Sequence, residues 1–395
     1  MQAKPGPGDL ALVLGGGGAR AAYQVGFLRA LGSMFPHLET PILTGVSAGA
    51  ISAVFLANHS GPFGTAVQEL ATAWENLTVE RVFRAGSLSL SSHALRWGVR
   101  LVSGGAKVGR TTHGMVDTSP LREYLCSVLG TNDGSLPGIA AKIESGRLRS
   151  LAITTTRYST NQSVTWVQSS GFQPWNRSNR RSAAAPITVD HVMASSALPI
   201  FFPAIELADG WHGDGGIRLT APLSPALHLG AERLIAISTR FVRASREPDA
   251  PRDEDYPPPA TVVGVLLSSV FLDMLDQDAM NMQRLNDYLR DVPIERRQGL
   301  RPAGLMLLRP SQDIGKLASQ HEPALPGMFR FLMRGMGTRE AKSPDSLSMV
   351  LFQPDYMRAL IQVGEADAWR RKDEIEAFVA GEDRPSIAQT GFWRI

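Results

Sequence analysis

The pentapeptide Gly45-Val46-Ser47-Ala48-Gly49 constrains the fold of this chain more than any other stretch, because only one strand-like run precedes it. A Gly-x-Ser-x-Gly sequence between a short apolar run and a helix is typical of a nucleophile elbow, a sharp turn that exposes a serine hydroxyl. Residues 41–44 supply the apolar run and residues 50–57 the helix. Glycine at 45 and 49 relieves backbone crowding in such a turn. A small-residue turn that packs a helix on a sheet has a similar composition, so the elbow needs support elsewhere.

A glycine-rich loop upstream supplies that support. Residues 10–14 form a continuous apolar run, as expected for a strand buried on both faces. The run ends in Gly15-Gly16-Gly17-Gly18-Ala19-Arg20, and apolar residues at helical spacing follow. A glycine-rich loop that opens a helix directs several backbone N–H groups to one spot, where the helix dipole also favours negative charge. Such a loop suits a phosphate or the oxyanion of an acyl-transfer intermediate.

The phosphate alternative fits the sequence less well. A P-loop requires Gly-Lys-Ser/Thr after its glycines, and Ala19-Arg20-Ala21 stands there instead. A dinucleotide fingerprint fits loosely as Gly16-x-Gly18-x-x-Ala21, but it also requires an acid at the end of the second strand. Glu39 lies before that strand, and Gly45-Val46-Ser47 occupies its end. We therefore favour an oxyanion over a phosphate as the group that the glycine-rich loop binds.

A serine nucleophile also needs a base, and the sequence offers histidines and one distinctive aspartate as candidates. Histidine oriented by an acid is the usual partner, but the eight histidines of this chain stand singly. The α/β-hydrolases place several strands before their elbow, and the residues before Ser47 leave room for one. Asp214 is followed by two glycines, which allow the close approach that a catalytic carboxylate needs. A plain Asp-Gly hairpin turn is the structural alternative for these residues.

Three motifs in this order resemble those of the patatin-like phospholipases: Gly16-Gly17-Gly18-x-Arg20, Gly45-x-Ser47-x-Gly49 and Asp214-Gly215-Gly216. Further similar stretches are residues 194–203, Pro222, and residues 351–356 and 360–368 near the C-terminus. The resemblance covers most of residues 8–370. It implies an α/β fold, a three-layer α/β/α sandwich with a central, mostly parallel sheet and a helical C-terminal extension.

The resemblance also implies the chemistry. Ser47 and Asp214 would form a catalytic dyad without histidine, and the Gly16–Gly18 loop would be the oxyanion hole. The motif-supporting residues would be Arg20, Gly45, Gly49, Gly215 and Gly216. No metal or organic cofactor enters such a mechanism.

Two positions depart from the family pattern. Ala21 stands where the family usually has glycine, and Ala221 replaces the asparagine common before Pro222. We expect alanine to be tolerated at position 21, which is helical. The change at position 221 concerns how the loop of Asp214 is held.

The chain is divided into a catalytic unit and an extension. Residues 8–310 are predicted to form the α/β domain, with a helical insertion at about 60–147 and a mobile, proline-rich connector at about 244–260. Residues 311–395 are predicted to form a helical extension packed on the same domain. The predicted strands lie near 10–15, 41–46, 148–156, 162–168, 233–239 and 303–309.

Composition limits the location and the partners. With 43% hydrophobic and 19% charged residues, the 395-residue chain is expected to be globular with a large core. Its single cysteine fits a reducing compartment, and no signal peptide or membrane span is predicted, so a cytoplasmic protein is expected. A net charge of +3 says little about partners. No basic run is interleaved with stacking residues, so nucleic acid is not an expected partner.

Residues 95–102 and 328–334 mix arginine with large apolar side chains. Such segments can lie at a bilayer interface, although amphipathic helices packed on a sheet have the same pattern.

From the motifs and the resemblance we predict a serine lipid acyl hydrolase of the phospholipase A or lysophospholipase type. It would make transient contact with a membrane surface at its inner face. The alternatives are a lipid acyltransferase with the same dyad, or a regulatory lipid- or nucleotide-binding protein with a vestigial site. The sequence predicts no oligomeric state, head group or acyl length.

Overall fold

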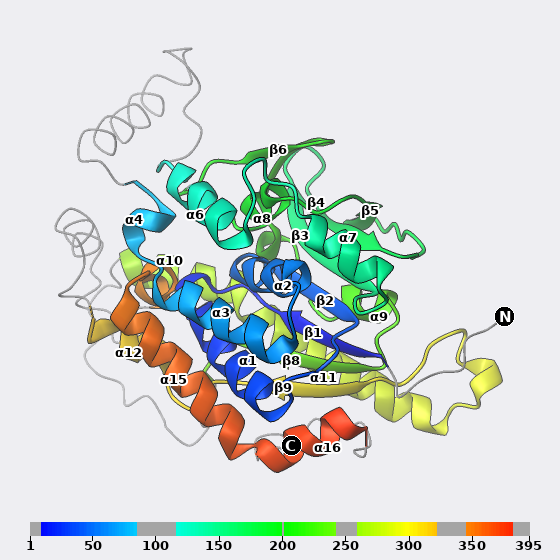
Figure 1. Cartoon of the computed structure of the whole chain (residues 1–395). Helices are drawn as coiled ribbons and strands as arrows, with labels where there is room; N and C mark the ends of the chain where they lie inside the picture. The colour runs from blue at the N-terminus through cyan, green and yellow to red at the C-terminus, as the bar shows by residue number, and fades with distance from the viewer. Residues whose placement is uncertain (1–8, 85–115, 200, 242–258, 322–344, 382–395) are drawn as a thin grey trace.

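The computed structural model describes residues 9–84, 116–199, 201–241, 259–321 and 345–381 (Figure 1). The strands in these ranges are β1 (Leu10–Leu14), β2 (Ile42–Val46), β3 (Ser150–Arg157), β4 (Gln162–Ser169), β5 (Arg180–Ala184), β6 (Ile205–Leu207), β7 (Gly210–Asp214), β8 (Arg233–Ile237) and β9 (Gly304–Leu308). The helices up to the fourth strand are α1 (Ala22–Met34), α2 (Ala48–Asn58), α3 (Phe63–Glu75), α4 (Val79–Val82), α6 (Ser119–Leu129) and α7 (Pro137–Glu144).

The later helices are α8 (Val189–Ser195), α9 (Ser224–His228), α10 (Pro259–Phe271), α11 (Asp273–Asp291), α12 (Ile314–Ser319), α14 (Asp345–Val350), α15 (Pro354–Arg370) and α16 (Lys372–Ala380). Three short 3₁₀ turns are η1 (Gly18–Ala21), η2 (Gly215–Ile217) and η3 (Ile294–Arg296).

The strands form one sheet in the order β5-β4-β3-β2-β1-β8-β9, with β7 pairing with β3 and β6 pairing with β7. Strands β3, β2, β1, β8 and β9 run parallel to one another. Strands β4 and β7 are antiparallel to β3. The fold is the expected mostly parallel α/β sheet, and parallel strands of this kind place their loops at the carboxyl edge, where ligands bind.

Helices cover both faces of the sheet, as the alternation along β1 shows. Leu10, Leu12 and Leu14 pack in a hydrophobic cluster with residues of α1, α2, α3 and α15. Ala11 and Val13 point to the other face and pack with residues of α9 and α11. Successive side chains of a strand point to opposite faces, so a run buried throughout needs a helical layer on each side. The molecule is therefore the expected three-layer α/β/α sandwich.

The C-terminal helix α15 lies against α1, the first helix of the chain (Figure 1). The backbones approach closely, because a Cβ atom at Gly26 would lie 1.9 Å from the carbonyl oxygen of Ile361. Tyr23 donates a hydrogen bond to Asp367 (3.1 Å), and Arg29 forms an ion pair with Glu365 (2.6 Å). A helical C-terminal segment thus packs on the sheet, while the division at residue 310 stays a prediction.

All six predicted strands are present, and the sequence missed the three that lie between β4 and β8. Strand β5 carries two arginines, β6 is only three residues long with a glutamate in the middle, and β7 contains two glycines, so none shows an apolar run. The helical pattern over 261–290 is interrupted at Leu272, which separates α10 from α11. Residues 95–102, residues 328–334 and most of the predicted connector lie outside the described residues.

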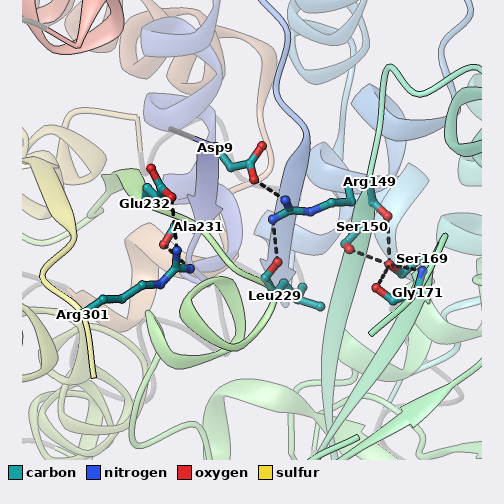
Figure 2. A network of polar contacts seen from close by, with 9 residues as sticks. All are labelled: Asp9, Arg149, Ser150, Ser169, Gly171, Leu229, Ala231, Glu232 and Arg301. Carbon is teal, nitrogen blue, oxygen red and sulfur yellow. Dashed lines mark hydrogen bonds and ion pairs between the residues drawn. The ribbon is translucent and has the colours of Figure 1, made fainter. Parts of the chain in front are cut away.

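A polar network fastens the amino edge of the sheet (Figure 2). Arg149, just before β3, forms an ion pair with Asp9, just before β1, and donates to the carbonyl oxygen of Leu229 (2.6 Å). Arg301 donates to the carbonyl oxygen of Ala231 (3.2 Å) and pairs with Glu232, just before β8. The further contacts drawn join Ser150, Ser169 and Gly171. Each cation of this network has an acidic partner, so we assign it to holding the strand starts together.

Candidate active site

Ser47 lies in a strained turn between β2 and α2. Its backbone has φ 53° and ψ −130°, a conformation that non-glycine residues rarely adopt and that is found where function requires it. The flanking glycines are required by close contacts. A Cβ atom at Gly45 would lie 2.7 Å from the Cα of Ala50, and one at Gly49 would lie 2.2 Å from the carbonyl oxygen of Leu14. The sharp strand-to-helix turn expected of an elbow is therefore present, with Ser47 at its centre.

Strand β3 brings Ser47 and Asp214 together. Its first five residues pair with β2, which ends at Val46 opposite Thr154. Its next residues pair along the same edge with β7, whose last residue, Asp214, lies opposite Thr155. The two strands therefore meet end to end on β3. The hydroxyl of Ser47 donates to Oδ2 of Asp214 at 2.6 Å.

Burial raises the pKa of Asp214 to about 7. The side chain is completely buried, and desolvation disfavours its charged form. Hydrogen bonds from Ser47 and from the backbone N–H of Gly216 (2.8 Å) partly oppose this effect. A carboxyl with such a pKa is ionised in part of the molecules near neutral pH and can exchange a proton with a bound hydroxyl.

The glycines after Asp214 allow two close approaches. A Cβ atom at Gly215 would lie 2.0 Å from the carbonyl oxygen of Thr154, and one at Gly216 would lie 2.4 Å from the ring of Phe271. Asp214 is not in a hairpin turn, because the turn between β6 and β7 lies at residues 208–209. The backbone of Asp214 is held by Thr156, whose hydroxyl donates to its carbonyl oxygen at 2.8 Å. None of these contacts involves Ala221.

Two serines that the sequence analysis gave no role hold the backbone of the elbow. Oγ of Ser195 accepts the N–H of Ser47 (2.9 Å) and donates to the carbonyl oxygen of Thr154 (2.6 Å). Ser196 donates to the carbonyl oxygen of Ser47 (3.1 Å). Both serines fall in the stretch 194–203, which resembles the family. That likeness is the only sequence signal for them, because Ser47, the partner of both, lies nearly 150 positions away in sequence.

The glycine loop lies beside Ser47. A Cβ atom at Gly16 would lie 3.1 Å from Cβ of Ser47. Gly17 has φ 139° and Gly18 has φ 55°, and both line the same cavity as Ser47. These are left-handed conformations that favour glycine. Ala21 has φ −64° and ψ −14°, so alanine fits this helical position as expected.

The side chain of Arg20 contacts the C-terminal segment. The side chain is buried, and its Nε donates to Oγ of Ser348 in α14 at 2.6 Å. Next to it, a Cβ atom at Gly18 would lie 2.0 Å from the carbonyl oxygen of Met349. Arg20 therefore supports the motif by joining the glycine loop to α14.

An apolar cavity opens beside Ser47 and Asp214. It holds about 590 Å³ of space, part of it open to solvent. Its polar side chains are Ser47, Ser196 and Asp214. The other lining residues are Gly17, Gly18, Ala48, Ile51, Trp74, Leu77, Val82, Leu121, Leu198, Phe202, Phe271, Met349, Val350 and Phe352. A wall of this kind suits a hydrocarbon chain whose reactive group lies at the serine.

His212 is not a partner of Ser47. Its Nδ1 lies 2.9 Å from the hydroxyl of Thr155 and its Nε2 lies 2.7 Å from Oδ1 of Asp209, so both ring nitrogens are occupied. Burial lowers the pKa of His212, and the hydrogen bond and charge of Asp209 oppose this effect. The ring is therefore largely neutral at pH 7 and belongs to a buried network beneath the site.

Two buried or partly buried acidic residues of α11, Asp276 and Asp278, bind other parts of the protein. Asp276 forms ion pairs with Arg240 and Arg309, both at 2.9 Å. Asp278 accepts the N–H of Leu223 at 2.8 Å. Among the described residues, no group of three or more histidine, cysteine, aspartate or glutamate side chains is arranged to hold a metal ion. In the same part of the chain, no helix combines the length and apolarity of a membrane span.

The sequence matches the model of the patatin-like phospholipase family over residues 12–227, more than half of the chain. The protein belongs to the patatin-like phospholipase family. The family is named for phospholipase activity, which supports a lipid hydrolase. No match was found among curated proteins.

Three solved structures match this chain at low sequence identity and with TM-scores below 0.5. Human GIVD cytosolic phospholipase A2 is 12% identical, with a TM-score of 0.46, over 95% of this chain and 60% of that one. VipD from Legionella pneumophila is 12% identical (TM-score 0.36; 88% and 67% coverage). ExoU, a type III effector of Pseudomonas aeruginosa, is 14% identical (TM-score 0.32; 94% and 63%). This chain spans about 60% of the length of the human protein. The family assignment rests on the sequence match over residues 12–227.

Proposed function

We propose that the protein is a serine lipid acyl hydrolase that cleaves phospholipids, lysophospholipids or other fatty esters. The observation that carries this proposal is the 2.6 Å hydrogen bond between Ser47 and Asp214 at the wall of an apolar cavity. The family match supports the reaction class. No metal or organic cofactor is part of the proposed mechanism.

Acylation begins with the ionised form of Asp214. Its carboxylate accepts the proton of Ser47 as Oγ attacks the ester carbonyl carbon, and the carbonyl electrons move onto oxygen. Backbone N–H groups of the Gly16–Gly18 loop stabilise the resulting oxyanion. Collapse of the tetrahedral intermediate breaks the bond to the alcohol oxygen, and Asp214 gives its proton to that oxygen.

Deacylation repeats these steps with water. Asp214 accepts a proton from water as the water oxygen attacks the acyl carbon, and the oxyanion forms at the same loop. The second intermediate expels Ser47, which regains its proton from Asp214, and a fatty acid is released. An alcohol in place of water would make the protein an acyltransferase with the same dyad.

The proposal includes the surroundings of the chemistry. The C-terminal segment, predicted as an extension beyond residue 310, contributes Met349, Val350 and Phe352 to the cavity wall, so we propose that it takes part in substrate binding. We also propose a cytoplasmic protein that contacts the inner face of a membrane transiently. A lipid substrate and a single cysteine, Cys126, support this location.

The test combines substrate profiling with dyad variants. The purified full-length protein is incubated with mixed phospholipids, lysophospholipids and neutral glycerides, with and without an added alcohol acceptor, and products are identified by mass spectrometry. We expect free fatty acids, and transfer of the acyl group to the alcohol as the main product would favour the acyltransferase. Ser47→Ala and Asp214→Asn should each abolish turnover, and the double variant should lose no more, because the two residues act as one unit.

Ser52 offers a matched control for the serine substitution. It lies in α2, the helix that follows Ser47. It is completely buried, and its hydroxyl has no hydrogen-bond partner among the described residues. Ser52→Ala should therefore keep wild-type turnover. Substantial hydrolysis by folded Ser47→Ala or Asp214→Asn would rule out the dyad, and an inactive wild type would favour the vestigial site.

A further inference from the structure

Thr239 lies just after β8, far from the glycine loop in sequence, and its side chain contacts that loop. It is 3% exposed, and its hydroxyl donates to the carbonyl oxygen of Gly16 at 3.2 Å. A Cβ atom at Gly17 would lie 2.6 Å from the same hydroxyl oxygen and 3.4 Å from Cβ of Thr239. One side chain therefore contacts both residues of the Gly16–Gly17 peptide.

This contact determines the direction of a backbone donor. A trans peptide is planar, so its C=O and N–H bonds point in opposite directions. When Thr239 holds the carbonyl oxygen of Gly16, the N–H of Gly17 points to the side away from Thr239. Gly17 and Ser47 line the same cavity. Both flanking residues are glycines, so without the hydroxyl little else restricts rotation of this peptide.

The segment that carries Thr239 is itself held firmly. Strand β8 pairs with β1 up to Ile237 opposite Leu14, so the loops that follow the two strands lie side by side. The N–H of Ser238 donates to the carbonyl oxygen of Leu308 at 2.8 Å. Arg240 forms ion pairs with Asp273 and Asp276 of α11 at 3.0 and 2.9 Å. Thr239 is therefore fixed from both sides.

We infer that Thr239 is a positioning residue that aims the N–H of Gly17 at the oxyanion through its hydrogen bond to Gly16. The inference rests on the proposed function. Donors aimed in advance stabilise the transition state because no reorganisation is needed during the reaction. Thr239 touches neither Ser47 nor the substrate carbonyl in this scheme, so its loss should affect kcat rather than substrate binding.

The test compares two substitutions of Thr239 on a short soluble ester. Thr239→Val keeps the shape and removes the hydroxyl, and Thr239→Ser keeps the hydroxyl. Loss of a whole oxyanion donor lowers kcat about 10²- to 10³-fold, so we expect a misaimed one to cost about 10- to 100-fold in Thr239→Val. KM should change less than about twofold, and Thr239→Ser should recover most of the lost kcat.

Thr44 provides the matched control. It is buried in β2, three residues before Ser47, and its hydroxyl has no hydrogen-bond partner among the described residues. Thr44→Val should keep wild-type kcat and KM, which would separate the effect of Thr239 from a general loss of buried threonine. Melting temperatures of all variants check folding, and Thr239→Ala replaces Thr239→Val if the latter does not fold.

The outcomes distinguish the inference from the proposed function. A wild-type protein that neither hydrolyses the ester nor reacts at Ser47 with a fluorophosphonate would overturn the proposed function. An active wild type with unchanged kcat in folded Thr239→Val would overturn the inference alone. Equal losses in Thr239→Val and Thr239→Ser, or a loss confined to KM, would also contradict a role of the hydroxyl in aiming the loop.

Discussion

At the residue scale, the proposed proton chemistry depends on a single buried carboxyl, that of Asp214. Burial raises the pKa of Asp214 to about 7, whereas it lowers the pKa of His191 to about 4 and also lowers that of His212. Burial therefore shifts these two histidines and Asp214 in opposite directions. The pH dependence of the reaction should report Asp214.

We predict that kcat/KM for a short soluble ester rises with pH and levels off above an apparent pKa near 7, because only the ionised carboxyl accepts the serine proton. Initial rates over a pH series measure this limb. If kcat/KM does not fall as pH is lowered through this value, and instead falls only at alkaline pH, Asp214 is not the base.

The same pKa affects stability in the opposite sense. The ordinary pKa of the carboxyl is 3.8, so between that pH and about 7 the folded protein binds a proton that the unfolded chain has released. The contribution of Asp214 to the free energy of unfolding therefore falls as pH rises through this window. Asp214→Asn cannot ionise, so thermal melts should show its stability relative to wild type improving between about pH 5 and about pH 8.

His212 is expected to be structural. His212→Ala should lower kcat less than tenfold, about 1.4 kcal/mol of barrier, because Asp214 rather than the ring contacts Ser47. It should lower the free energy of unfolding by about 1–3 kcal/mol, because Thr155 and Asp209 lose a buried partner. Rates and melts of the same preparation separate the two effects. A collapse of kcat in a folded variant would make histidine the base.

At the scale of elements, the site is assembled where loops meet at the carboxyl edge of the sheet. The glycine loop after β1 lies between the elbow after β2 and the segment after β8. Strand β3 aligns the elbow with the end of β7. Substitutions in these loops should therefore affect activity even where the strands themselves stay intact.

Gly17→Val tests the oxyanion loop. The side chain would meet Thr239 and adopt a left-handed conformation, so the N–H donors would be re-aimed. Loss of one donor costs on the order of 3 kcal/mol, two to three decades in rate. We expect such a loss in kcat on a short ester, with the fold retained.

Gly146→Val is the control for backbone strain. Gly146 also has a positive φ (75°), but a Cβ atom there would meet nothing within 4 Å, and it lies between α7 and β3, near the amino edge of the sheet. Both variants should melt at a lower temperature than wild type, and only Gly17→Val should lose activity. Full esterase activity in Gly17→Val would exclude the loop as the oxyanion hole and reopen nucleotide binding there.

At the scale of the whole molecule, the described surface adds to the expectation of a lipid interface. Helix α10 carries no charged residue and exposes Val262, Val265 and Leu266 at helical spacing. Phe271, at the end of the same helix, lines the catalytic cavity. An exposed apolar stripe next to a cavity of this kind is typical of an interaction site.

We predict that hydrolysis rises when the substrate forms micelles or vesicles, more so with anionic lipid. Reversing Arg96, Arg100, Arg330 and Arg334 to glutamate should weaken vesicle binding in a sedimentation assay and spare a short soluble ester. These arginines lie outside the described residues, and their role is predicted from sequence alone. The control reverses four exposed arginines of α11 and α15: Arg284, Arg290, Arg358 and Arg370. If the four predicted arginines are structural, their reversal would lower hydrolysis of vesicle lipid and of the short soluble ester equally.

Local patterns in the sequence determined the elements and motifs of this protein. The sequence predicted six of the strands, including the parallel core. Residues 10–14 gave the clearest signal, because a strand buried on both faces is apolar along its whole length. Glycines around Ser47 and Asp214 predicted turns with close backbone approach, which the structure has at Gly49 and Gly215. Strand β7 could not be predicted in this way, because it is short, contains glycine and lies partly at the surface.

Only the tertiary structure decided how these parts meet. The pairing of β3 with β2 and then with β7 brings residues 47 and 214 within a hydrogen bond, and no local pattern encodes that register. The pKa of Asp214 depends on its burial, and Ser195 and Thr239 act through partners far away in sequence. The sequence fixes which residues are available for chemistry, because backbone conformation and burial preferences are local. Long-range packing fixes their distances, protonation and orientation, because these depend on atoms contributed by every layer of the fold.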